Sequence, residues 1–113
     1  MAKRKQKDLF HFDEMGLYRL LYSVEDVMLL GEMANVPLRP LIEYDRKHGS
    51  NYLETLELYL KHNGSIQAVA EEMFTHRNTV IYRITNIKKL LNTELETTEE
   101  RLRYQMAFYI RNM

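Results

Sequence analysis

The sequence predicts an all-α protein, and three observations carry that prediction. Apolar residues recur at helical spacing along most of the 113 residues, with few β-branched runs. The prolines and glycines fall mostly at breaks between these segments. Between residues 65 and 91 two helical segments meet with no proline and no long loop, which indicates a tight turn. We therefore predict five or six helices and at most one short strand, arranged as a helix-turn-helix three- to four-helix bundle with an N-terminal helical appendage.

Length and composition exclude several classes of protein. A chain of 113 residues is one domain, or one small domain with an appendage, and can bury a single core. It contains no cysteine, which excludes disulfides and thiolate zinc sites. No apolar run approaches the roughly 20 residues needed to cross a bilayer, and no signal-peptide pattern opens the chain. A cytoplasmic protein without membrane contact is expected.

The N-terminal part divides into a charged start and a helical region. Residues 1–15 are expected to be a flexible or tag-like N-terminus, because the chain opens with a polar, basic run. A basic tail can contact DNA, but a solvated terminus has the same charges. Residues 16–49 are expected to be a helical segment, although its apolar stretch 17–22 fits either a strand or a helix.

A helix is predicted from Val24 to about Asn35. Ser23 precedes it as an N-cap, with Asp26 three residues later as a weaker form of the capping box. Its apolar stripe consists of Val27, Met28, Leu30 and Ala34. Gly31 lies inside this helix, where glycine costs about 1 kcal/mol relative to alanine, so it marks a close helix contact or an earlier helix end.

The prolines Pro37 and Pro40 fall between this helix and the next. Pro40 fits the first turn of a helix that runs to about His48, and Gly49 ends that helix. Residues 50–113 then form the C-terminal unit. The first helix of this unit presents an apolar face of Leu53, Leu56, Tyr59 and Leu60.

The next two helices are defined by a cap, a turn and an apolar period. Gly64 ends the preceding helix and Ser65 caps the first of the pair. Phe74 and Thr75 make the turn, with Thr75 or His76 as the cap of the second helix. The residues expected to face the core are Ala68, Val69 and Met73 in the first helix and Val80, Ile84, Ile87 and Leu91 in the second.

The last helix begins at a capping box. Thr97 precedes Glu100 by three residues, so each side chain can bond the backbone N–H of the other. The residues expected to face inward are Leu102, Met106, Tyr109 and Ile110. No internal repeat or low-complexity segment interrupts this pattern of helices.

The central pair of helices has the features of a helix-turn-helix. The two helices cross tightly and need a small side chain where they approach, which Ala70 supplies. Met73 and Val80 fit the positions that close the small core around the turn. Many such motifs have glycine in the turn, where this chain has Phe74. A phenylalanine could anchor the turn in the core, but it needs a different backbone geometry.

The second helix of the pair predicts a DNA-binding surface. If its apolar residues face inward, the polar residues at its start lie on or beside the outward face. The candidate DNA-binding residues are His76, Arg77, Asn78, Thr79, Tyr82, Arg83 and Lys88. Arginine can hydrogen-bond guanine O6 and N7, and asparagine can bridge adenine N6 and N7. Threonine and tyrosine hydroxyls suit phosphates or base edges, whereas His76 fits a cap or a phosphate contact.

The charge distribution favours the same surface. The net charge is zero, which by itself argues weakly against a nucleic-acid partner. Between His76 and Leu91, however, there are four basic residues and no acidic one, as phosphate attraction requires. A solvated helix would have the same charges, and Asn78 and Thr79 also suit helix capping. The small-residue helix and the short turn before this segment favour a recognition helix.

The sequence lacks the features of an enzyme or a metal site. The acidic residues form no paired general acid and base, and there is no phosphate-cradling glycine loop. His11, His48 and His62 are scattered, without the spacing of zinc ligands. No catalytic residue, metal or cofactor is therefore expected.

Several runs of residues match a known family. They are Leu53–Leu60, Asn63–Ser65, Ala70–Phe74, His76–Val80, Tyr82–Ile84 and Arg101–Leu102. With them, the stretch from Tyr52 to Ile110 resembles the C-terminal DNA-binding domain of PucR-type bacterial transcription regulators, the group that includes sugar-diacid regulators of the CdaR kind. Members of this family commonly have an aromatic or large apolar residue at Phe74, and usually an aliphatic one where this chain has Thr75.

The resemblance implies a division of the chain and a function. Residues 50–113 resemble the helix-turn-helix DNA-binding domain, and residues 16–49 more loosely resemble the end of the upstream regulatory region. In such regulators an upstream domain senses a metabolite, and we expect this effector domain to be absent from the chain. We expect sequence-specific binding of double-stranded DNA for transcription regulation, by a homodimer with the helix at about 76–91 in the major groove. The alternative is a protein-interaction module that has kept the fold without reading DNA.

Overall fold

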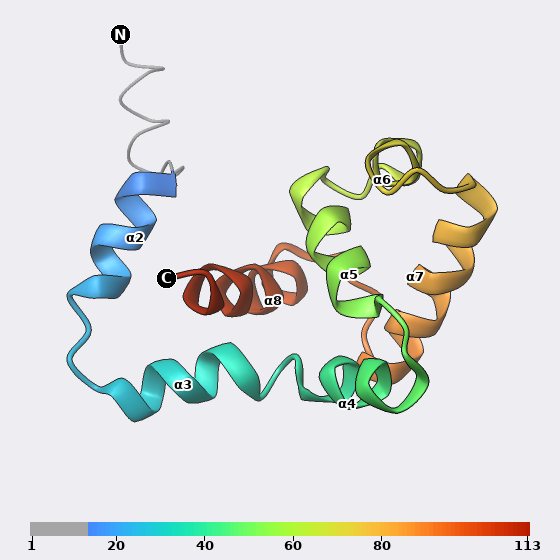
Figure 1. The fold of residues 1–113 in the computed structure, drawn as a ribbon. Coiled ribbons are helices and arrows are strands. Elements are labelled where there is room, and N and C mark those ends of the chain that lie inside the picture. The colour runs from blue at the N-terminus through green and yellow to red at the C-terminus, as the bar shows by residue number, and fades with distance from the viewer. Residues whose placement is uncertain (1–13) are drawn as a thin grey trace, which may run out of the picture.

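The computed structural model describes residues 14–113, which are helical and contain no strand (Figure 1). The helices are α2 (Glu14–Tyr22), α3 (Val27–Asn35), α4 (Arg39–His48), α5 (Tyr52–Lys61), α6 (Ile66–Glu72), α7 (Arg77–Leu91) and α8 (Thr98–Arg111). The all-α prediction is confirmed. The described residues form seven helices where five or six were expected, because the ambiguous stretch 17–22 is helical and belongs to α2. The basic opening of the expected N-terminal tail, and His11, lie outside the described residues.

One hydrophobic core includes residues from both sides of position 50. Leu38 and Leu41, at the start of α4, are fully buried together with Leu56 of α5 and Ile87 of α7. The predicted face of α5 is confirmed: Leu56, Tyr59 and Leu60 are buried and Leu53 packs against them. Helix α4 contacts α5 and α7, whereas α3 packs against α8 (Figure 1). The domain boundary at residue 50 stays a prediction.

The start of α3 was predicted wrongly. The helix begins at Val27, three residues later than expected, and Asp26 is its N-cap, with a carboxylate that accepts the Leu29 N–H at 3.0 Å. Ser23 instead donates its hydroxyl to the Leu20 carbonyl at 2.6 Å, at the end of α2. Both residues suit a cap, and aspartate forms the capping bond because the chain between the two helices remains extended at Asp26.

The apolar stripe expected on α3 is buried only toward its C-terminal end. Ala34 is buried and Leu30 is half-buried, whereas Val27 and Met28 are 77% and 80% exposed. Gly31 marks neither a close contact nor a helix end, because a Cβ there would meet nothing within 4 Å and the helix continues beyond it. Helical spacing predicted which residues share a side of α3. It did not predict that α8 covers only the C-terminal part of that side.

The junction between α4 and α5 is held by Asp45. Pro40 lies in the first turn of α4 and Gly49 ends it with a φ of 63°, as predicted. From α4, the Asp45 carboxylate accepts the Ser50 hydroxyl at 2.5 Å and the Tyr52 N–H at 2.8 Å. It also accepts the N–H of residue 53 at 2.9 Å. One side chain therefore caps the next helix across the turn.

The inward face of α8 was predicted wrongly. Leu102 is 49% exposed, and the other three residues expected to face inward are only half-buried. The buried residues of α8 are Tyr104, Ala107 and Phe108. These three residues share one side of α8, at spacings of three and one, so the buried stripe is centred on different residues from those expected.

The capping box at the start of α8 is confirmed. The Thr97 hydroxyl accepts the Glu100 N–H at 3.0 Å, and the Glu100 carboxylate accepts the Thr97 N–H at 2.9 Å. Glu100 also accepts the Thr93 hydroxyl at 2.7 Å and the Glu96 N–H at 3.0 Å. The bond from the Thr97 backbone, followed by those from Thr93 and Glu96, lowers the pKa of Glu100 to about 2.

Acid is expected to destabilise the fold through Glu100. Because its pKa is lowered on folding, the ionised carboxylate stabilises the fold above about pH 4.5, and this contribution is lost as the pH falls toward 2. The urea midpoint of Glu100→Gln should therefore fall less between pH 6 and pH 3 than that of the parent. Glu99→Gln is the control, since Glu99 is exposed and accepts none of these bonds. Equal pH dependence in the parent and Glu100→Gln would contradict this expectation.

Candidate nucleic-acid interface

Helices α6 and α7 form the predicted helix-turn-helix. Ser65 caps α6 by accepting the Ala68 N–H at 3.1 Å, as expected. Val69 and Ala70 of α6 are buried in the same core as Val80 of α7. The small side chain predicted for the crossing is therefore in the core that joins the two helices.

The turn between them has a left-handed backbone at Phe74. The Thr75 N–H donates to the Ala70 carbonyl at 3.0 Å and the Phe74 N–H donates to the Glu71 carbonyl at 3.3 Å, the pair of bonds that closes a Schellman motif. Phe74 has a φ of 53° and its side chain is 95% exposed. The expectation that this ring anchors the turn in the core is therefore wrong. The different backbone geometry that phenylalanine needs in this turn is present.

The first turn of α7 is open to a ligand. His76 occupies the N-cap position, but its side chain makes no capping bond, and its carbonyl accepts the N–H groups of Thr79 and Val80 at 3.0 and 3.2 Å. Within the described residues, neither Asn78 nor Thr79 makes a capping bond through its side chain. The first turn contains no acidic residue. The positive end of the helix dipole is therefore not neutralised by this part of the chain.

The predicted inward face of α7 is confirmed. Val80, Ile84 and Ile87 are buried, and Leu91 packs against the core. On the same helix the Asn86 side-chain amide donates to the Tyr52 hydroxyl of α5 at 3.0 Å. The ring of Tyr52 stacks on Tyr44 of α4 with centroids 4.7 Å apart. These contacts fix the rotation of α7 about its axis and so decide which residues face outward.

The structure gathers the candidate DNA-binding residues at the start and along one side of α7. His76, Arg77, Asn78 and Tyr82 are exposed, whereas Thr79, Arg83 and Lys88 are half-buried. Among the described residues, the side chains of Arg77, Asn78 and Thr79 have no hydrogen-bond or ion-pair partner. The Arg83 guanidinium lies 3.9 Å from the sulfur of Met73, which holds it beside the turn.

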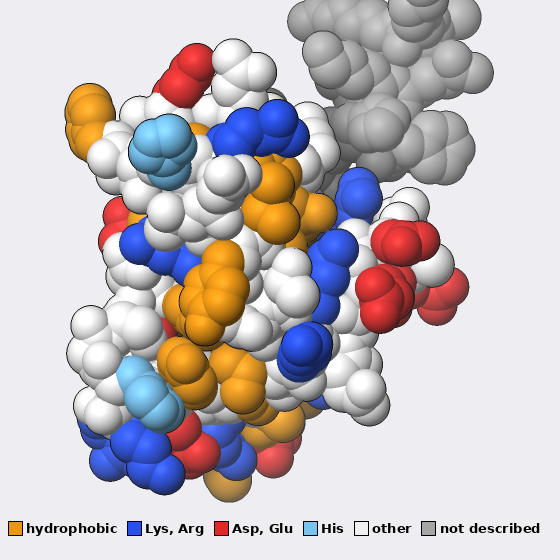
Figure 2. Space-filling view, turned by 90° about the vertical axis from the view of Figure 1, so that its right-hand side faces the viewer, with side chains coloured by type: hydrophobic (Ala, Val, Ile, Leu, Met, Phe, Trp, Pro, Cys, Tyr) orange, Lys and Arg blue, Asp and Glu red, His pale blue; other side chains and the backbone are white. Residues whose placement is uncertain are grey.

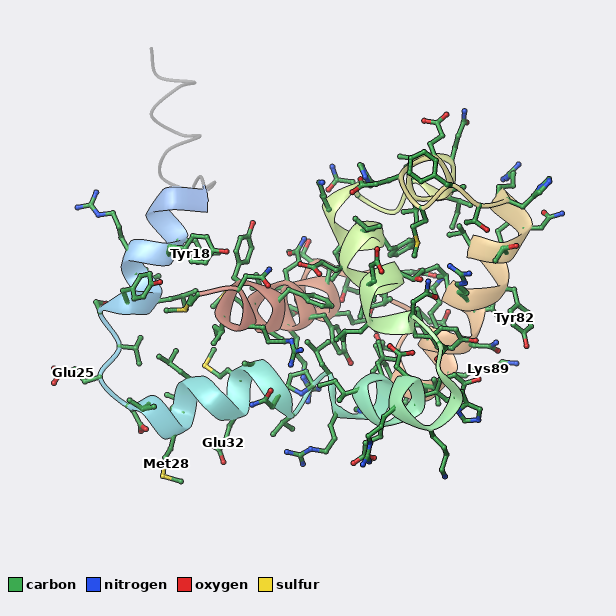
Figure 3. The ribbon with its side chains drawn as sticks, viewed as in Figure 1. Tyr18, Glu25, Met28, Glu32, Tyr82 and Lys89 are labelled. Atoms are coloured by element: carbon green, nitrogen blue, oxygen red, sulfur yellow. The ribbon has the colours of Figure 1, made fainter. Side chains whose placement is uncertain are left out.

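Lys89 belongs to the same surface, although it is not among the seven candidates. Figure 3 shows Tyr82 and Lys89 pointing away from the body of the protein on the outer side of α7. They are seven positions apart, which is about two helical turns, and this spacing was the signal that could have added Lys89. Figure 2 views this side of the molecule: basic and hydrophobic side chains occupy its middle, histidine side chains lie to the left, and acidic side chains lie toward its edges.

Glu72, the last residue of α6, is paired with residues at the end of α5. Glu72 accepts a hydrogen bond from the His62 ring at 2.6 Å and lies 3.5 Å from the Lys61 ammonium nitrogen. The bond to His62, and to a smaller extent the charge of Lys61, lowers the pKa of Glu72. Of the histidines considered as metal ligands, His62 thus hydrogen-bonds Glu72, and His48 stacks on Tyr44. The cations of α7 are left available to an external anion.

A family model of the PucR C-terminal helix-turn-helix domain matches residues 52–110, from the start of α5 into the last turn of α8. The chain belongs to this PucR family. The match confirms the resemblance seen in the sequence and covers the whole surface described above. The chain therefore carries a DNA-binding helix-turn-helix domain of transcription regulators.

Several curated relatives are similar over most of this PucR-family chain. The DNA-binding transcriptional activator AdeR of Bacillus subtilis (strain 168) is 28% identical over 95% of this chain and 25% of the activator. The proline-responsive transcriptional activator PutR of the same strain is 33% identical over 86% of this chain and 23% of its own length. The carbohydrate diacid regulator of Escherichia coli (strain K12) is 31% identical over 89% and 26%. No solved structure matches the chain.

The PucR-family chain spans about a quarter of the length of these relatives. The relatives are named as regulators of transcription, a class distinct from enzymes.

Within residues 14–113, no helix has the length and apolar character to cross a bilayer. The same residues contain no cluster of three or more side chains suited to hold a metal ion.

Proposed function

We propose that this chain binds double-stranded DNA sequence-specifically, with α7 in the major groove, and so contributes to bacterial transcription regulation. The observation that carries the proposal is the start of α7, where the exposed side chains of Arg77 and Asn78 have no partner among the described residues. In a helix-turn-helix the second helix presents its N-terminal residues to the base edges. These two side chains occupy that position.

The residues of α7 have different roles in this proposal. Arg77 donates to guanine O6 and N7, and Asn78 bridges adenine N6 and N7. The hydroxyls of Thr79 and Tyr82 bind base edges or phosphates. The phosphate contacts come from His76, Arg83, Lys88 and Lys89, together with the open N–H groups of the first turn. The first group specifies the sequence and the second supplies most of the affinity.

We further propose that two copies act together. A homodimer places two recognition helices on half-sites about 34–36 Å apart and so matches a palindromic operator. In a longer protein of the length of the relatives, an upstream effector domain would control this binding in response to a metabolite. The DNA-binding role places the protein in the bacterial cytoplasm, where the chromosome lies.

Selection of duplexes from a random DNA pool tests the proposal. At low salt the chain should enrich a two-part sequence, because each copy reads one half-site. If Arg83, Lys88 and Lys89 each neutralise one phosphate, the logarithm of the binding constant should fall with the logarithm of salt concentration at a slope of about −2.7 per copy. Failure to retain any duplex at low salt would contradict the proposal and favour the protein-interaction module.

A further inference from the structure

Phe74 combines two features that do not favour folding. Its φ of 53° lies in the left-handed region, where a side chain with a Cβ is less favourable than glycine. Its ring is 95% exposed, so the fold gains almost nothing from burying it. The residue occupies the position of the Schellman motif that glycine most often fills.

The other non-glycine residues with positive φ in residues 14–113 have local explanations. Asn63 and Asn92 have φ values of 53° and 55°, and asparagine tolerates this region because its short polar side chain can bond locally. Leu95 has a φ of 56° but is fully buried, so its packing offsets the backbone cost. Within the described chain, Phe74 has neither explanation.

The position of Phe74 suggests what the ring contacts. It lies two residues before His76, the N-cap of α7, and directly after Met73, the C-cap of α6. When the second helix of a helix-turn-helix enters the major groove, the first helix crosses the backbone, and the turn between them passes the edge of the groove. An exposed side chain on this turn is therefore continuous with the surface of Arg77 and Asn78.

We propose that the Phe74 ring contacts the 5-methyl group of a thymine at the edge of the major groove. The proposal rests on the proposed function of α7. The thymine methyl is the apolar group that base pairs present in the major groove, whereas the other base-edge groups and the phosphates are polar. A phenyl ring has no hydrogen-bonding group for those polar partners. Phe74 thus adds a preference for thymine beside the bases read by Arg77 and Asn78.

Replacing thymine by deoxyuridine in the selected duplex tests this contact, because it removes only the methyl group. At one thymine per half-site, the replacement should weaken binding of the parent about fourfold per half-site, the factor for one buried methyl group. Phe74→Ala should bind the thymine duplex about tenfold more weakly than the parent. It should also bind the thymine and deoxyuridine duplexes equally. A deoxyuridine effect that persists in Phe74→Ala, or that is missing in the parent, would overturn the proposal.

Phe74→Gly separates DNA binding from folding. Glycine suits the left-handed backbone, so this variant should unfold at the same or a higher urea concentration than the parent while binding as weakly as Phe74→Ala. A glycine variant that unfolds more easily would show that the ring stabilises the domain, which overturns the proposal.

Arg77→Ala distinguishes this inference from the proposed function on which it rests. If the parent binds no duplex, both fail. If the parent binds and Arg77→Ala weakens binding but Phe74→Ala does not, only the Phe74 contact is wrong.

Discussion

Arg77→Ala is expected to weaken binding to the selected duplex by about 5- to 150-fold per half-site, and Asn78→Ala by a similar factor. This range corresponds to the 1–3 kcal/mol that one bidentate base contact contributes to discrimination. Neither variant should alter the urea midpoint, because both side chains are exposed and have no hydrogen-bond or ion-pair partner among the described residues. The measurement is a titration of labelled duplex by fluorescence anisotropy, with variants at each base pair of the half-site.

Lys89→Ala is the matched control for these two variants. Lys89 lies on the outer side of α7, far from the start of the helix (Figure 3). We expect it to contact a phosphate and not a base. Its removal should weaken binding to all duplexes alike and make the salt slope shallower by about 0.9, with no change in base preference. If Arg77→Ala and Asn78→Ala both bind a pool of genomic fragments as the parent does, α7 does not read DNA.

Ile87→Ala is expected to lower the free energy of unfolding by about 2–5 kcal/mol, the range for truncating a fully buried isoleucine. Ile87 is completely buried between α7 and the rest of the core. Since a domain of this size is stable by roughly 5–15 kcal/mol, much of the population would then unfold in low urea. The loss of helical circular dichroism with urea concentration measures this change.

Ile81→Ala removes the same atoms from the same helix at an exposed position. Ile81 is 40% exposed, so its truncation should cost about 1 kcal/mol or less. The pair of variants tests the rotation of α7, because six residues place the two side chains about 120° apart around the helix axis. Equal urea midpoints for Ile81→Ala and Ile87→Ala would show that the inward and outward faces of α7 are assigned incorrectly.

Sequence reasoning predicted the elements whose signals are local. Ser65, Pro40, Gly49 and the Thr97–Glu100 box each depend on residues within one turn of helix, and the structure confirms all of them. The inward face of α7 was also predictable, because one core packs along one side of that helix. The face of α8 was not, since apolar residues lie on more than one side of this helix and their spacing alone does not decide which side is buried.

The site was predicted in its composition but not in all its geometry. The family resemblance and the polar start of α7 identified Arg77 and Asn78, whose exposure follows from the buried face of the helix. The exposure of Phe74 was missed, because an aromatic residue ordinarily indicates burial. The Schellman bonds around it depend on where α6 ends, which the sequence placed only to within a residue or two.

The carboxylate of Asp45 has a mechanical consequence. It spans the turn from α4 to the first N–H groups of α5, while α4 itself packs against α5 and α7. The turn cannot absorb a rotation of α4 by itself. Such a rotation would break these hydrogen bonds or move α5 together with α4. In a longer polypeptide, a rotation of α4 would therefore be passed on to α5 and α7.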